Sequence, residues 1–430
     1  MITKSKILDF QKSVVIAIGF MFFTINSHAA IEGITGPVFD LSARADHLST
    51  PDGGSVLFWS YAETTKSTGQ YPGPTLIVNE GDVVTVNLSN DLNVPVSVIF
   101  PGQGLVTTAP AGINPGLLTE EVPPGGGPVA YTFTAANPGT YTYHSGTRME
   151  LELEMGLVGA LIVRPTIMGV DHAYNHADTQ FDREILFLLT EMDPGIHLQV
   201  ESGDMDLVDF TQRFPNYWFI NGRAAPDTMR PVNDALLPKQ PYNCMPIMHP
   251  GDRMLLRIAG GGSDLHPFHH HGNHSRVIAR NGRMLSSSPG AGADMANNEF
   301  TIQSVPGQTV DSIFEWTGEG LGWDIYGHPT NDPGTLLPFE YAADHGKPIP
   351  TLEPDAKDLV IGPFYSGSPY LGSSGPLKPG DGGFNLNNGI VFMWHSHNER
   401  EMVNRGIFPG GMMTMLIIEK HPDPLVVINP

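Results

Sequence analysis

Two histidine-rich motifs in the second half of the chain carry side chains that could hold a metal ion. The first places His269 and His271 on either side of a third histidine, and the second reads His395-Ser396-His397. Successive residues of a β-strand point to opposite faces, so the two members of each histidine pair share one face. Imidazole binds copper and zinc well. The two pairs therefore predict a single metal site built from two strands.

The opposite face of the same strands is a candidate for a second metal ion. His266 lies an odd number of residues before His269 and therefore falls on the face of Ser396. A thiolate at residue 396 would be needed to complete such a site, but a serine hydroxyl is not deprotonated at neutral pH. His266 is thus a candidate metal ligand, but the thiolate that would be the strongest second ligand on this face is missing.

The distribution of turn-forming residues indicates an all-β protein. The chain has 49 glycines and 38 prolines, and they separate short alternating or β-branched segments such as 83–88 and 131–134. We found no long segment with helical periodicity, so the pattern is typical of β-sandwiches. In the run 150–154, glutamate alternates with leucine, which predicts a strand with one solvated acidic face. The alternative is that one of these acids reaches a metal beside His144.

Several motifs together resemble the multicopper oxidases, that is, the laccases and their relatives. The matching segments are 71–82, 138–146, 155–163, 266–272 and 395–413. This resemblance implies an all-β fold of two cupredoxin-like Greek-key β-sandwich domains. We place the N-terminal domain at residues 30–168 and the C-terminal domain at 169–430. The second domain carries a long Gly/Pro-rich insertion at about 319–389, where His328 or His345 could replace a missing ligand, although exposed loop histidines are the simpler interpretation.

The chain departs from the family pattern at the metal ligands. Family members carry four His-x-His pairs around a three-copper cluster, and two of those pairs are present here. A third is halved, because His144 is followed by Gly146, and the fourth, expected near 97–102, has no histidine. At the blue-copper position the cysteine is replaced by Ser396 and the second histidine falls at about Glu401. The implied metal ligands are His144, His269, His271, His395 and His397, with His266 as a further candidate.

The composition of the chain indicates which partners the protein can bind and in which compartment it is found. Residues 1–29 have the basic, apolar and small-residue regions of a secretory signal peptide, which predicts a secreted or periplasmic protein. The formal net charge of −22 argues against binding to nucleic acid or to an anionic membrane. The single cysteine, Cys244, leaves no internal disulfide, and we expect it to be a buried apolar residue.

Two functions remain open at this point. The first is an exported copper oxidoreductase with one or two histidine-ligated copper ions, no blue copper, and a small molecule or oxygen as substrate. The second is a non-catalytic copper-binding or copper-handling protein that retains the fold. Zinc suits the same imidazoles. Two-domain members of the family complete their cluster between subunits, so a homotrimer is also implied, in which His144 would meet the second domain of a neighbour.

Overall fold

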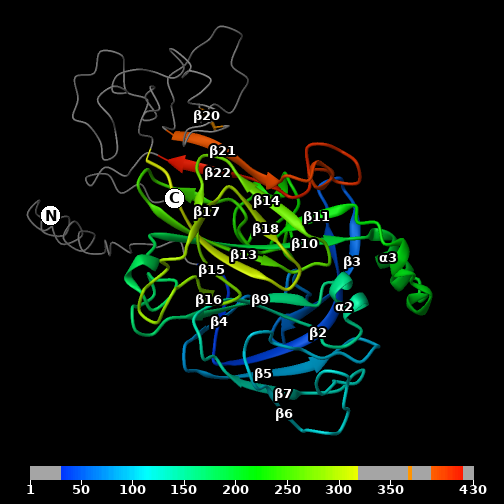
Figure 1. Ribbon diagram of the computed structural model, residues 1–430. Coiled ribbons are helices and arrows are strands. Elements are labelled where there is room, and N and C mark those ends of the chain that lie inside the picture. The colour runs from blue at the N-terminus through cyan, green and yellow to red at the C-terminus, as the bar shows by residue number, and fades with distance from the viewer. Residues whose placement is uncertain (1–30, 318–366, 370–388, 420–430) are drawn as a thin grey trace, which may run out of the picture.

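The computed structural model describes residues 31–317, 367–369 and 389–419, and these residues form mainly β-strands arranged in four sheets (Figure 1). The all-β prediction is therefore confirmed. The predicted signal peptide and nearly all of the insertion, including His328 and His345, lie outside the described residues.

The first domain is a sandwich of a four-stranded and a five-stranded sheet. The four-stranded sheet has the order β1 (Ile34–Thr35), β4 (Leu76–Asn79), β9 (Val158–Arg164) and β8 (Gly139–His144). The five-stranded sheet has the order β3 (Ser55–Glu63), β2 (Val38–Ser49), β5 (Val83–Asn90), β7 (Val129–Thr134) and β6 (Thr107–Ala109). In β5 the alternation is regular, since Val84, Val86 and Leu88 are fully buried between more exposed neighbours. These side chains join the core between the two sheets.

The second domain is a larger sandwich of two sheets. One contains β11 (Tyr217–Ile220), β10 (Arg183–Met192), β13 (Arg253–Gly260), β19 (Thr309–Glu315), β15 (Ser275–Arg280) and β16 (Arg283–Met284), with β17 (Asn297–Glu299) paired to β15. The other contains β12 (Ile247–Met248), β22 (Met413–Glu419), β21 (Gly389–Ser396), β14 (His266–His270) and β18 (Thr301–Ser304), with β20 (Gly367–Pro369) paired to β21. Trp316, Trp394 and Phe268 are buried in the core between them, together with Cys244, whose burial was predicted.

Helices are short and lie outside the sheets. The described ones are α2 (Met149–Met155), α3 (Pro194–Glu201) and the 3-10 turns η1 (Ala177–Thr179), η2 (Met205–Leu207), η3 (Phe210–Gln212), η4 (Asp227–Met229) and η5 (Glu399–Glu401). None of the helices in the described ranges is long and apolar enough to span a membrane. The prediction of a strand at 150–154 is wrong, because this run forms α2 and buries Glu152 and Glu154. Alternation over five residues cannot separate a strand from a short helix whose polar side chains find buried partners.

The two sandwiches pack through β8 and β9 of the first domain against β10, β13 and β19 of the second, so that the four sheets are stacked (Figure 1). The interface contains buried charges. Arg257 is fully buried and donates to Glu184, and Arg164 from the first domain donates to the same carboxylate. Arg257 also donates to the hydroxyl of Thr140 at 3.0 Å. These contacts tie strands from both domains to one buried ionic group.

Candidate metal centre

The two histidine pairs are brought together by the register of β14 and β21. The antiparallel pairing places His269 opposite His395 and Phe268 opposite Ser396. The chain continues this contact beyond the strand ends, since the backbone N–H of His397 donates to the carbonyl of Pro267 at 2.8 Å. The predicted sharing of one face by the two histidine pairs therefore rests on strand pairing.

Three of these imidazoles form a compact group. Each of His269, His271 and His395 offers a ring nitrogen, and the three nitrogens lie within 4.8 Å of one another. Nε2 of His271 and Nε2 of His395 lie 3.1 Å apart. Two nitrogens on one ion at about 2.0–2.1 Å from it need a separation of this size. The three residues thus fit a single copper or zinc ion.

His397 completes the group at its solvent side. Its ring centre is 5.0 Å from that of His269 and 5.5 Å from that of His395. The side chain of His397 is 55% exposed, whereas the other three histidines are buried. Among the described residues, the group is therefore buried on the side of His269, His271 and His395 and exposed on the side of His397.

Hydrogen bonds at Nδ1 orient two of the rings. Nδ1 of His395 donates to the carbonyl of Ser396 at 2.7 Å, and Nδ1 of His269 lies 2.7 Å from the hydroxyl of Thr301. In both residues Nε2 is left for a metal ion, as is usual for ligating histidines held by a second group. Thr301 stands opposite His269 in the pairing of β18 with β14, and its role could not be read from the sequence.

Two rings of this group, those of His269 and His395, are held in the neutral form that a metal ion requires. Burial lowers the pKa of His269 to about 3, with further lowering by the neighbouring His271, His395 and His397. Burial also lowers the pKa of His395. At neutral pH the nitrogen lone pairs of these two rings are therefore not lost to protonation.

His266 lies on the other face of the strand, as predicted, and is engaged by two carboxylates. It donates from Nδ1 to Glu401 and from Nε2 to Glu191, both at 2.9 Å, and its side chain is fully buried. Burial alone would lower the pKa of His266, but the two hydrogen bonds outweigh it and raise the pKa to about 9. His266 is therefore an imidazolium at neutral pH, with both ring nitrogens used.

The positions of the family's cysteine and second histidine belong to the same network. The hydroxyl of Ser396 donates to Glu401 at 2.6 Å, and the side-chain amide of Asn398 donates to the other oxygen of Glu401 at 2.8 Å. Glu191 also accepts from Arg213 at 2.6 Å. At the positions where a blue-copper site would have two imidazoles and a thiolate, this chain thus has one imidazolium, one hydroxyl and one carboxylate. These three groups do not fit blue copper.

His144 lies at the end of β8 and forms a backbone bridge with Ile99, inside the segment where the fourth pair was expected. A Cβ atom on Gly146 would lie 2.8 Å from Cγ2 of Ile99 and 3.1 Å from the hydroxyl of Ser97. These two side chains occupy the space that a histidine at residue 146 would need. Burial lowers the pKa of His144. The three-histidine group does not include His144, and the cavity that His144 lines is bordered in the second domain by glycines and Pro306.

Comparison with known proteins places these observations in a family context. The multicopper oxidase family model matches residues 57–167. A multicopper oxidase of Talaromyces pinophilus is 43% identical over 97 residues, which are 23% of this chain and 16% of that protein. An L-ascorbate oxidase of Cucurbita pepo var. melopepo is 33% identical over 133 residues, or 29% of this chain and 21% of that protein. The matched part of the chain thus spans at most about a fifth of the length of these two relatives.

Solved structures of other proteins resemble this chain over most of its length. A blue copper oxidase from Nitrosomonas europaea superposes with a TM-score of 0.55 at 18% identity, covering 88% of this chain and 85% of that one. A copper nitrite reductase from the same organism superposes with a TM-score of 0.51 at 15% identity, covering 91% and 96%. The predicted cupredoxin-like sandwich architecture is confirmed by this likeness.

Proposed function

Because this chain belongs to the multicopper oxidase family, we propose that it is an exported copper oxidoreductase whose copper is held by histidines alone. The observation that carries the proposal is the 3.1 Å separation of Nε2 atoms in His271 and His395, next to the ring of His269. We assign the metal site to these three residues, with His397 at its open side.

Copper bound at this group would supply one-electron exchange with a small reductant or with oxygen. The role of the chain is to supply neutral imidazoles, fix their orientation and control access. Thr301 and the carbonyl of Ser396 hold two rings by their Nδ1 atoms. His397 lies where a small molecule would approach, since it is the exposed member of the group.

We further propose that the protein has no blue copper. His266, Ser396 and Glu401 satisfy one another and leave no thiolate and no open imidazole nitrogen. The same network favours the second candidate, a copper-binding or copper-handling protein without catalysis, because the usual route of electron entry in the family would be closed. Turnover of oxygen by the purified, copper-loaded protein separates the two candidates.

Metal analysis of the purified protein, together with its electron paramagnetic resonance spectrum, tests the site. We expect one or two copper ions per chain, nitrogen-ligated and pale. The double variant His395→Ala/His397→Ala should lose most of the copper, while Ser396→Ala should keep it nearly intact. His274→Ala is the matched control, since His274 is an exposed histidine outside the group. Four coppers per chain, or full copper retention in the double variant, would overturn the assignment. Zinc in place of copper would keep the site but remove the redox function.

Two further properties stay predictions, namely export, which rests on the composition of residues 1–29, and the homotrimer, which the resemblance implies. Export with removal of residues 1–29 is checked by N-terminal sequencing of the secreted or periplasmic protein, and a mature protein beginning at Met1 would contradict it. The homotrimer, in which His144 would join a neighbour's metal site, is checked by the mass of the assembly in solution. A monomer that binds its copper stoichiometrically would contradict the homotrimer.

A further inference from the structure

A surface patch of the second domain combines two arginines with three exposed apolar side chains. The arginines are Arg400 and Arg405, and both are exposed. The apolar residues are Phe214, Ile407 and Phe408, whose exposed fractions are 56%, 61% and 67%. We call these five residues the arginine patch. Four of them lie in the connection between β21 and β22, which is drawn in red in Figure 1 and projects past the strand ends beside β11.

Contacts between two backbone segments bring the patch together. The backbone N–H of Arg405 donates to the carbonyl of Asn216 at 3.0 Å. Nη2 of Arg400 donates to the carbonyl of Pro215 at 3.1 Å, although these two residues are 185 positions apart in the chain. Both contacts place the connection between β21 and β22 beside the segment that carries Phe214. The residues of the arginine patch therefore lie on neighbouring segments of the surface.

The hairpin that carries part of the patch has a fixed shape. Asn404 and Ile407 exchange two backbone hydrogen bonds, at 3.0 and 2.9 Å. Between them, Arg405 and Gly406 have φ angles of +47° and +83°, and a type I′ turn requires positive φ at both central residues. The side chain of Asn404 also donates to the carbonyl of Ala225 at 2.7 Å. A surface that is already ordered in this way loses little conformational entropy when a partner binds.

The guanidinium of Arg400 is held in place before any partner arrives. Its central carbon lies 3.8 Å from the ring centre of Phe214 and 5.6 Å from that of the buried Trp218. The hydrogen bond to Pro215 uses one of its five N–H donors. Arginine stacked on an aromatic ring can still bind a carboxylate through two parallel hydrogen bonds. Arg400 therefore offers an oriented site for a carboxylate.

The two arginines of the patch form no ion pair in the part of the chain that the structure describes. Arg400 contacts two aromatic rings and a carbonyl. Other exposed basic side chains are paired, as Arg148 is with Asp206 and Arg253 is with Glu315. The chain has a formal net charge of −22, so two unpaired cations on one surface are complementary to a negatively charged partner.

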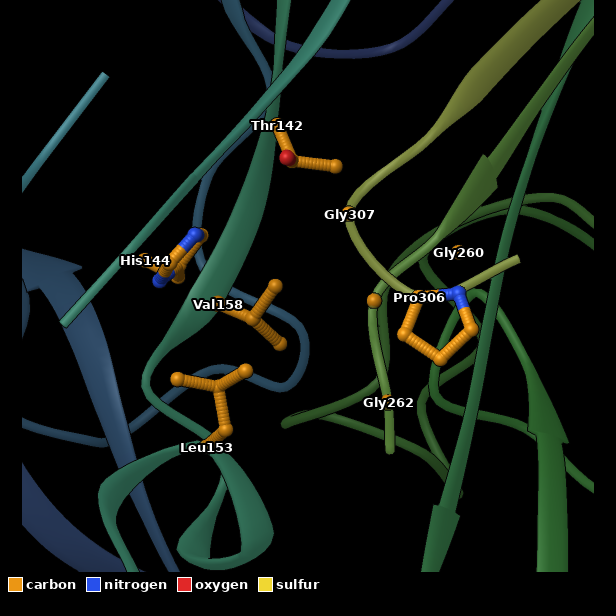
Figure 2. Close-up of a pocket in the computed structure, with 9 residues that line it drawn as sticks. Thr142, His144, Leu153, Val158, Gly260, Gly262, Pro306 and Gly307 are labelled. Carbon is orange, nitrogen blue, oxygen red and sulfur yellow. The ribbon is translucent and has the colours of Figure 1, made fainter. Parts of the chain in front are cut away.

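The pocket between the two domains offers nothing comparable to a carboxylate. Its nine lining residues, which Figure 2 shows, include neither lysine nor arginine. Burial lowers the pKa of the one histidine among them, His144, so this histidine is not a cation at neutral pH. Of these two places, only the arginine patch can pair with an anionic group.

The charge of the molecule also limits the shape of the partner. A nucleic acid or an anionic membrane extends beyond two arginines and would meet the acidic groups of the chain, such as Glu399, which is 70% exposed beside Arg400. A short segment with carboxylates on either side of apolar residues contacts only the patch. Arginine and aromatic side chains are also the residue types that contribute most to protein interfaces.

We propose that the arginine patch is the docking site for an acidic segment of a partner protein, in which two carboxylates flank apolar side chains. The carboxylates bind Arg400 and Arg405, and the apolar side chains pack on Ile407 and Phe408. This interaction goes beyond the proposed copper chemistry and does not depend on it, because none of the proposed copper ligands belongs to the patch.

The test uses short acetylated and amidated peptides that differ in one property. Glu-Leu-Phe-Glu carries two carboxylates, and Gln-Leu-Phe-Gln has the same shape without them. In a titration of the full chain, we expect the first peptide to bind roughly tenfold more tightly at low salt. This preference should shrink as salt is added, because the charges are exposed. Glu-Gly-Gly-Glu lacks the apolar side chains and should bind at least roughly tenfold more weakly than Glu-Leu-Phe-Glu. Equal affinity for the first two peptides, or no binding of Glu-Leu-Phe-Glu, would overturn the proposal.

Exposed variants locate the binding without disturbing the core. Arg400→Gln and Arg405→Gln should each weaken binding of Glu-Leu-Phe-Glu roughly threefold, and the double variant should no longer prefer it over Gln-Leu-Phe-Gln. Arg283→Gln is the matched control, since Arg283 is exposed on β16, at the opposite edge of the sheet from β11. Ile407→Ser should also weaken binding, whereas Leu105→Ser, at an exposed position of the first domain, should not. A double arginine variant that keeps the full preference would contradict the assignment.

A direct signal separates the patch from other sites. The Nε–H resonance of Arg400 should shift with Glu-Leu-Phe-Glu and stay in place with Gln-Leu-Phe-Gln. Each titration is repeated with copper-loaded protein and with a copper chelator, and equal binding in both supports a surface independent of the metal centre. Binding that disappears with the copper would refute that independence. Vesicles of phosphatidylglycerol and a single-stranded oligothymidylate are the competing partners. If either binds more tightly than the peptide and requires Arg400, the patch recognises a polyanion and the proposal fails.

Discussion

Ser396 donates a 2.6 Å hydrogen bond to Glu401, and both side chains are buried. These are the positions where the resemblance expects the thiolate and the second imidazole of a blue-copper site. The same oxygen of Glu401 accepts from His266. His266, Ser396 and Glu401 are therefore linked by hydrogen bonds. Ser396 and Glu401, which stand in place of the two family ligands, bond directly to each other.

This relationship predicts that restoring the cysteine alone does not restore blue copper. In Ser396→Cys, Glu401 still holds His266 and contributes a hard oxygen where soft or borderline ligands are needed. We expect copper-loaded Ser396→Cys to remain pale. The double variant Ser396→Cys/Glu401→His provides two imidazoles and a thiolate, and it is expected to develop the intense visible absorption.

Visible absorption and electron paramagnetic resonance of the copper-loaded proteins check this prediction. Ser312→Cys is the control for a new buried thiol, since Ser312 is buried on β19. A strong blue band in the unaltered chain, or in Ser396→Cys by itself, would contradict it.

The contact between Thr301 and His269 leads to a second prediction. Thr301→Val keeps the shape of the side chain but removes the hydroxyl that lies 2.7 Å from Nδ1 of His269. Loss of such an outer group weakens metal binding by about 10–100-fold. Thr301→Ser retains the hydroxyl and should restore most of the affinity.

Competition with a copper chelator of known affinity measures the effect. The control is Thr85→Val, in which a hydroxyl paired with Thr132 at 3.1 Å is removed from the first domain, far along the chain from the histidines. Copper affinity that is the same in Thr301→Val and Thr85→Val would show that Thr301 does not position its histidine.

The sequence predicted the part of the site that depends on local alternation. His269 and His395 each share a face with the partner two residues on, and this followed from strand geometry alone. The resemblance supplied the pairing of the two strands, which the register of β14 with β21 bears out. Thr301 and Glu191 could not be found in this way, because they come from β18 and β10 and reach the histidines only through tertiary packing.

For the run 150–154, the prediction from local alternation was wrong. Its alternation predicted a solvated strand, yet it forms α2 and buries two carboxyl groups. The hydroxyl of Ser145 donates to Glu152, and Arg213 pairs with Glu154 at 2.6 Å. Partners that lie 7 and 59 residues away stabilise these acids, and no local pattern encodes such partners.

Glu152 yields a third prediction, about the pH dependence of stability. Burial raises the pKa of Glu152 to about 8, despite the opposing hydrogen bond from Ser145. Between pH 4.5 and 8 the unfolded chain ionises this group while the folded chain keeps it protonated, so stability falls as pH rises. Glu152→Gln removes this dependence, and its stability relative to the unaltered chain should increase by a few kcal/mol from pH 5 to pH 9.

Denaturant unfolding at several pH values provides the measurement. Glu150→Gln lies on the same helix but at an exposed position, and we expect its stability to follow that of the unaltered chain at each pH. A constant difference between Glu152→Gln and the unaltered chain over this range would contradict the prediction.

The ion pairs of His266 give the last prediction. The folded pKa of His266 is raised to about 9 from 6.5, so its contribution to stability is fully present below pH 6.5 and is lost as pH rises through 9. His266→Gln leaves Glu191 and Glu401 without their cation, and at pH 7 this should cost about 3–5 kcal/mol. At pH 10 the unaltered chain has itself lost the proton, so the cost should be about 2–3 kcal/mol smaller.

Chemical unfolding with a chelator present measures both values, and His270→Gln is the control. His270 is buried in the same strand, but burial lowers its pKa to about 3, so it is neutral at both pH values. The cost of His270→Gln should therefore stay nearly constant. A cost of His266→Gln that is equally independent of pH would mean that His266 is neutral between its two carboxylates.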